Sequence, residues 1–107
     1  MLTSAPMQTH PTSPAELLPA ALRLHQDGQL REAAAIYEQI LSCHPTHPDA
    51  LHLLGLVAFQ LGRFQQAINL IKRAIAVIPS VAGYHCNCGE AWRRLGKLDE
   101  AIHCHRE

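Results

Sequence analysis

The stretch YHCNCGEAWRRLG at residues 84–96 holds three potential metal or redox ligands, His85, Cys86 and Cys88. Imidazole nitrogen and thiolate sulfur are ligands that tetrahedral zinc accepts. In a helix, however, Cys86 and Cys88 would point about 200° apart around the axis, so the two thiolates could not grip one ion. A redox pair normally has two intervening residues at a helix start. The Cys-x-Cys spacing therefore favours packing over chemistry.

A wider grouping leaves zinc open as a minor alternative. His85 and Cys88 share one helical face, and His103, Cys104 and His105 follow on the next predicted helix. Such side chains could bind zinc if the fold brought them together. We expect instead that these thiols and imidazoles pack in a helical core and that the chain binds no metal or other cofactor.

The rest of the sequence gives weaker signs of a metal site or of catalysis. Cys43, His44 and His47 lie in a predicted loop with Pro45 and Pro48, which is a looser arrangement for a metal. The sequence has no glycine-rich phosphate loop, no serine nucleophile elbow and no His-Glu-x-x-His helix. We therefore expect that this chain itself is not an enzyme.

Composition narrows the function classes. Nine Lys and Arg balance nine Asp and Glu, so no net charge is available to bind nucleic acid or an anionic membrane. Eight histidines would add eight positive charges in acid, which should weaken the fold. Residues 1–13 lack a signal-peptide pattern and are rich in Ser, Thr and Pro, which predicts a disordered lead. No apolar run reaches a membrane span, so we expect a cytoplasmic protein whose four cysteines are free thiols.

The elements that carry these residues repeat with a period of 34. Gly28, Gly62 and Gly96 are spaced by this period. Chance would place three glycines in one chosen column about once in three thousand trials. Further columns follow the same spacing: Ala33, Ala67 and Ala101; Leu30, Phe64 and Leu98; Ala21, Gly55 and Gly89; Pro45 and Pro79.

Each unit reads as two helices. In the second unit, apolar residues recur at helical spacing over 51–58 and again over 64–78. Gly62 supplies the turn between them, because glycine can adopt a positive φ, and Pro79 stops the second helix. Small residues at positions 55, 67 and 74 predict a close approach of the two helix backbones.

These columns resemble the tetratricopeptide repeat family. That pattern has a bulky residue, then Leu-Gly, then an aromatic residue, and later alanine, an aromatic residue and proline. The aromatic columns are only partly filled in this chain, and the second unit offers at these positions Leu51, Leu54-Gly55, Ala58, Ala67, Ile71 and Pro79. The resemblance implies an all-α solenoid of antiparallel helix pairs with about 2.8 repeats. The predicted repeats cover 14–47, 48–81 and 82–107, the last being incomplete.

The resemblance also implies a concave groove, lined by the first helix of each repeat, that binds a protein or peptide partner. An apolar centre favours a segment with hydrophobic anchors, although Leu56 and Phe59 could equally pack the seam between repeats. By position in the repeat, the lining is Leu18, Leu22, His25, Asp49, His52, Leu56, Phe59, Gln60, Cys86, Glu90, Arg93 and Arg94.

Two subclasses of the family can be compared by position. Members that clamp the acidic tail of a chaperone need Lys, Asn and Arg at columns where this chain has Leu18, Leu22, Leu53, Gly83 and Asn87. Chaperone-tail binding is therefore not expected. The runs HPDALHLLG and YHCNCGEAWRRLGKLDEAI are similar to the N-terminal repeats of O-linked N-acetylglucosamine transferases of the SPINDLY type. That likeness implies an alternative function, substrate targeting in a longer glycosyltransferase.

The third repeat stops at Glu107, seven residues before the phase of Pro45 and Pro79. Repeat arrays need a polar capping helix at their ends. We therefore expect the chain to be a piece of a longer repeat protein. Its uncapped C-terminal face would then be available for self-association.

Overall fold

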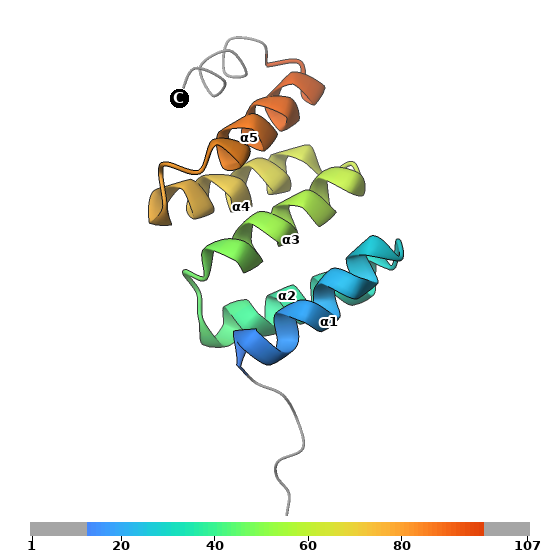
Figure 1. Ribbon diagram of the computed structural model, residues 1–107. Helices are drawn as coiled ribbons and strands as arrows, with labels where there is room; N and C mark the ends of the chain where they lie inside the picture. Colours follow the sequence, from blue (N-terminus) through green and yellow to red (C-terminus); the bar gives the residue numbers. More distant parts are fainter. Residues whose placement is uncertain (1–12, 98–107) are drawn as a thin grey trace, which may run out of the picture.

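The computed structural model describes residues 13–97, which fold into five α-helices and no strand. These are α1 (Pro14–Gln26), α2 (Leu30–Cys43), α3 (Pro48–Gln60), α4 (Phe64–Val77) and α5 (Ala82–Arg94). Helices α1 and α2 form one antiparallel pair, α3 and α4 form a second, and α5 packs on α4, so that the helices stack along one direction (Figure 1). The predicted all-α architecture of helix pairs is confirmed over this range. None of these helices has both the length and the apolar character needed to cross a bilayer.

Proline and histidine fix two of the helix starts. Pro14 and Pro48 occupy the first turns of α1 and α3, where a missing backbone N–H costs nothing and the fixed φ is already helical. At the start of α3, His47 Nδ1 accepts a hydrogen bond of 3.1 Å from the Ala50 N–H. This imidazole therefore acts as the helix N-cap.

All three predicted glycine turns adopt the same left-handed conformation. Gly28, Gly62 and Gly96 have φ of 82°, 80° and 81°. Beyond each glycine, the next backbone N–H reaches back to a carbonyl in the last helical turn, from Gln29 to Leu24, from Arg63 to Ala58 and from Lys97 to Trp92, at 2.9, 2.8 and 2.9 Å. This six-to-one bond is the Schellman motif, which a glycine in the left-handed region permits.

The tightest packing lies between α3 and α4. Gly55 faces α4 so closely that a Cβ at this position would lie 2.8 Å from Ile71 Cγ1 and 3.3 Å from the Ala67 carbonyl oxygen. Ala67, Ile71 and Ala74 have no exposed surface. The predicted close approach at the small-residue positions is confirmed.

The end of α4 differs slightly from the apolar pattern. The pattern runs to Ile78, but the helix ends at Val77, and Ile78 is an extended C-cap with φ −132° and ψ 95°. Proline disfavours helical backbone in the residue before it, so Pro79 ends the helix one residue early. Ile78 remains 37% exposed as a result.

Residues 1–12 and 98–107 lie outside the described residues. The predicted disordered lead, apart from Ser13, and the predicted last helix with His103, Cys104 and His105 fall there. The structure therefore bears on the first two repeats and on the first helix of the third.

Candidate functional site

The cysteines and histidines of the third repeat have separate roles. Cys88 is 1% exposed and belongs to the main hydrophobic core, whereas Cys86 is exposed. The His85 imidazole donates from Nε2 to the Pro79 carbonyl oxygen at 2.7 Å, which ties α5 to the loop before it. Within residues 13–97 no three His, Cys, Asp or Glu side chains are gathered as a metal site would require. The wider zinc alternative depends on His103, Cys104 and His105, outside the described range.

The residues of the loop before α3 likewise have separate structural roles. The His47 imidazole caps α3, and the Pro45 carbonyl oxygen accepts a hydrogen bond of 3.3 Å from Arg73 Nη2 on α4. Cys43 is exposed at the end of α2, with its sulfur 3.8 Å from the Ser42 hydroxyl oxygen. These contacts brace the junction between the first two helix pairs.

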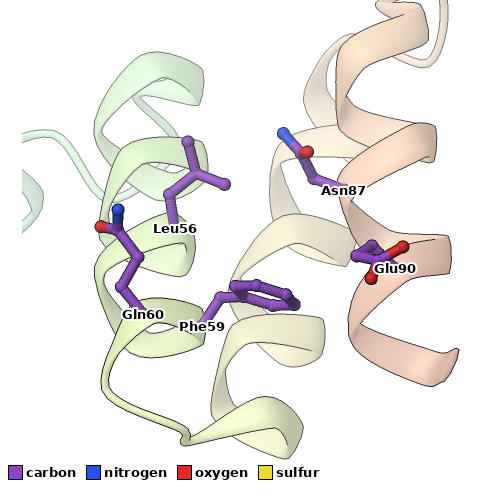
Figure 2. Close-up of a pocket in the computed structure, with 5 residues that line it drawn as sticks. All are labelled: Leu56, Phe59, Gln60, Asn87 and Glu90. Carbon is purple, nitrogen blue, oxygen red and sulfur yellow. The ribbon is translucent and has the colours of Figure 1, made fainter. Parts of the chain in front are cut away.

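A cavity of about 200 Å³ opens between α3 and α5, on the side formed by the first helix of each pair. Its lining comprises Leu56, Phe59 and Gln60 from α3 and Asn87 and Glu90 from α5. Figure 2 shows Leu56 and Phe59 pointing toward the space between the helices, with Asn87 directed into it from the opposite side. The cavity thus has an apolar wall on α3, formed by Leu56 and Phe59, and polar groups at Gln60, Asn87 and Glu90.

One edge of this cavity is tied to the first repeat through a histidine. His25 Nε2 lies 2.6 Å from Gln60 Oε1, and because an amide oxygen only accepts, Nε2 is the donor. In the neutral ring, Nδ1 then accepts from the buried Tyr37 hydroxyl at 3.2 Å. Burial raises the pKa of Tyr37 to about 12, which keeps this hydroxyl protonated as a donor. One imidazole therefore joins α1, α2 and α3.

A second histidine joins α3 to α5 in a similar way. The Asn87 amide donates from Nδ2 to His52 Nε2 at 2.8 Å, so the proton of the neutral ring sits on Nδ1. The Tyr84 ring packs on the imidazole with centroids 4.6 Å apart. Burial lowers the pKa of His52, while the Asp49 carboxylate opposes that change in part. Both histidine bridges join residues 35 apart, one more than the repeat period.

Aromatic rings and arginines contact two of the residues that line the cavity, Phe59 and Glu90. Phe59 and Phe64 meet edge to face with centroids 5.3 Å apart. The Arg94 guanidinium lies over both rings, 5.4 Å and 5.2 Å from their centroids, within the range of a cation–π contact. Arg93 instead forms an ion pair with Glu90, donating from Nε to Oε1 at 3.2 Å and from Nη2 to Oε2.

The predicted groove residues divide into three sets, the first being His25 and His52 in the two bridges described above. The structure brings Leu56, Phe59, Gln60 and Glu90 together at the cavity, with Arg93 and Arg94 bound to members of its lining. Asp49 lies exposed in the first turn of α3, and Leu18 and Leu22 are half-buried on α1, away from the cavity lining. Cys86 is exposed on α5 but does not line the cavity.

Sequence reasoning missed several residues that shape this surface. Asn87 was not among the predicted lining residues of the groove, yet it lines the cavity and bonds His52. Tyr37, Phe64 and Tyr84 support the histidines and Arg94 from behind. No spacing in the sequence singled out the two histidine bridges, because many other residue pairs lie the same number of positions apart.

Acid is expected to destabilise the folded chain partly through His52. An unfolded histidine has a pKa near 6.5. Because the pKa of His52 is lowered in the folded chain, stability is lost as the pH falls from about 6.5 to that lowered value. Between pH 7.5 and 5.5, the melting temperature of a His52→Gln variant should fall less than that of the parent.

The control is His44→Gln, which alters an exposed histidine in the loop between α2 and α3. This variant should lose as much stability in acid as the parent. Equal pH dependence in the parent and the His52→Gln variant would contradict the assignment to His52. The groups that interact with this imidazole are Asn87, Tyr84 and Asp49.

Comparison with known families and proteins places these features in context. The family model of anaphase-promoting complex, cyclosome, subunit 3 matches residues 26–107. The probable UDP-N-acetylglucosamine–peptide N-acetylglucosaminyltransferase SEC of Arabidopsis thaliana is 29% identical over 95 residues, covering 89% of this chain and 10% of that protein. Human tetratricopeptide repeat protein 7B is 31% identical over 74 residues, covering 69% of this chain and 8% of that protein. The chain thus spans a tenth or less of these curated relatives.

Solved structures show the same fold at lower identity. The crystal structure of MamA has a TM-score of 0.84 and 21% identity, over 89% of this chain and 56% of that chain. The second tetratricopeptide repeat domain of Spaghetti (RPAP3), bound to the HSP90 peptide SRMEEVD, has a TM-score of 0.82 and 16% identity, over 86% of this chain and 85% of that chain. The predicted tetratricopeptide-type solenoid is confirmed.

Proposed function

This chain belongs to the tetratricopeptide repeat family of anaphase-promoting complex, cyclosome, subunit 3, and from that membership we propose that it is a protein-interaction scaffold. Its partner is a protein segment that lies along α1, α3 and α5. The observation that carries this proposal is the cavity between α3 and α5, with the apolar wall of Leu56 and Phe59. A related solved domain holds a peptide, which supports the class of partner.

The geometry favours an extended segment with one apolar anchor. Ligand pockets for whole small molecules usually measure about 300 to 1,000 Å³, so the smaller cavity here suits a single side chain. Polar groups around it, such as the Asn87 amide, can bond the backbone of a bound segment. The chaperone-tail clamp is not part of the proposal, since its columns carry residues such as Leu18, Leu53 and Gly83.

Replacing Leu56→Glu should weaken the binding of peptides selected on the parent chain, because a carboxylate in the apolar wall would reject the anchor. The expected loss is at least tenfold in affinity, as one buried aliphatic side chain contributes roughly 1.5–3 kcal/mol. Peptides are selected from a displayed random library on the parent, and their affinities are measured by fluorescence anisotropy.

The matched control is Val77→Glu, which makes the same kind of change at a side chain 40% exposed on α4. This variant should bind the selected peptides as the parent does, and circular dichroism should show both variants folded. Selected peptides that bind folded Leu56→Glu with parental affinity would refute the groove as their site.

A second function is favoured by one specific observation, the 29% identity to the plant glycosyltransferase over 89% of this chain. In this alternative the same groove presents protein substrate to a catalytic domain elsewhere in a longer polypeptide. Intact-mass measurement of the native protein, together with an N-acetylglucosamine transfer assay on it, separates the two. A native protein of about this chain's mass, without transfer activity, would contradict the glycosyltransferase alternative and leave the scaffold function as the remaining proposal.

A further inference from the structure

We propose that the surface at α3 and α5 selects a peptide in which an apolar residue stands next to an acidic one, with the apolar side chain in the cavity. The inference rests on the proposed groove function and adds the chemistry of the partner. It is carried by the contact between the apolar wall of the cavity and the Arg94 guanidinium.

The apolar half of the selectivity comes from α3. Leu56 and Phe59 are half-buried, so each presents apolar surface that remains open at the cavity. Phe59 also packs against the main core and against Phe64, which fixes its ring. A fixed wall of this kind binds an aliphatic side chain without reordering the protein.

The acidic half comes from the difference between the two neighbouring arginines. Arg93 donates two hydrogen bonds to Glu90, whose carboxylate already balances the charge of this guanidinium. Arg94 is stacked over Phe59 and Phe64 and contacts no carboxylate within residues 13–97. Stacking uses the face of a guanidinium and leaves its N–H edge available for a carboxylate.

Position and charge together set the type of the two peptide residues. Phe59 forms part of the cavity wall and also supports Arg94, so an anchor in the cavity and a carboxylate at Arg94 would both lie beside the same ring. Glu90, Arg93 and Arg94 carry one net positive charge. That charge matches one carboxylate better than a doubly charged phosphate.

The test uses the full 107-residue chain and four blocked hexapeptides that differ only at two central positions. The central pairs are Leu-Glu, Leu-Gln, Ala-Glu and Ala-Gln, and affinities are measured by amide chemical-shift titration. The parent should bind Leu-Glu about fivefold more tightly than Leu-Gln, the upper range for an exposed ion pair. Arg94→Gln should erase this preference while still favouring Leu-Gln over Ala-Gln.

Arg31→Gln serves as the charge-matched control, because it removes one exposed arginine from α2, which does not line the cavity. This variant should retain the fivefold preference. A parent that shifts the Leu56 and Asn87 amides equally with Leu-Glu and Leu-Gln would overturn this inference and leave the groove function standing. A parent whose groove amides shift with none of the peptides would count against both. If instead the groove amide signals shift with rising protein concentration in the absence of peptide, the surface would be assigned to contact with a second copy of the chain.

Discussion

Substituting Ala67→Trp is expected to lower the melting temperature of the chain sharply. Ala67 has no exposed surface and its backbone already lies against Gly55 of the partner helix. An indole at this position has no space to occupy, and overpacking typically costs 1–3 kcal/mol or more. A domain of this size has only about 5–15 kcal/mol of total stability. Thermal melts followed by circular dichroism at 222 nm provide the measurement.

The control for this substitution lies on the same helix. Ala76 is exposed on α4, so Ala76→Trp adds the same indole to the same helix without displacing a neighbour. Its melting curve should resemble that of the parent. A parental melting curve for Ala67→Trp itself would show that the helix pairing described for α3 and α4 is wrong.

Substituting Gly55→Val is expected to lower stability by about 2–3 kcal/mol. A Cβ alone would lie 2.8 Å from Ile71 Cγ1, and valine adds two further methyl groups in the same crowded space. For a domain of this length each kcal/mol corresponds to about 4–8 °C, so the melting temperature should fall by roughly 8 °C or more. Scanning calorimetry or chemical denaturation measures the change.

Gly83→Val provides an internal comparison, because Gly83 is also helical but a Cβ there would meet nothing within 4 Å. Valine has a slightly better helix propensity than glycine, so this variant should match or slightly exceed the parent. A double variant with Ile71→Ala should show a smaller cost for Gly55→Val than the single change does, since the clashing side chain is gone. Equal costs for valine at positions 55 and 83 would contradict the close approach.

The helix pairs could be predicted from sequence because a few columns determine them. Gly62 and its equivalents indicate a left-handed turn, a conformation that other residues rarely adopt, and Pro79 indicates the end of a helix. Gly55 and Ala67 report a backbone contact through the absence of side-chain bulk. Each of these positions requires a backbone geometry that one residue type satisfies best. The same residue type therefore recurs every 34 positions, and the geometry can be predicted from that recurrence.

The site was less predictable, because position in a repeat does not fix what a side chain touches. Gln60 and His25 were both expected to face a partner, yet they bond each other across two repeats. Arg93 and Arg94 are adjacent in sequence, but one pairs with Glu90 and the other stacks on two phenyl rings. The offset between neighbouring repeats and the choice of rotamer decide these contacts, and neither is encoded in the spacing of residues along the chain.

Each helix in residues 13–97 packs mainly on the helix before it and the helix after it. Contacts are therefore short in sequence separation, and proteins with such low contact order fold in microseconds to milliseconds. The α3–α4 pair contains the largest share of fully buried aliphatic side chains, including Leu51, Ile68 and Ile71. Nucleation is thus favoured at this central pair, with the neighbouring helices adding outward from it, as in a one-dimensional lattice of coupled units.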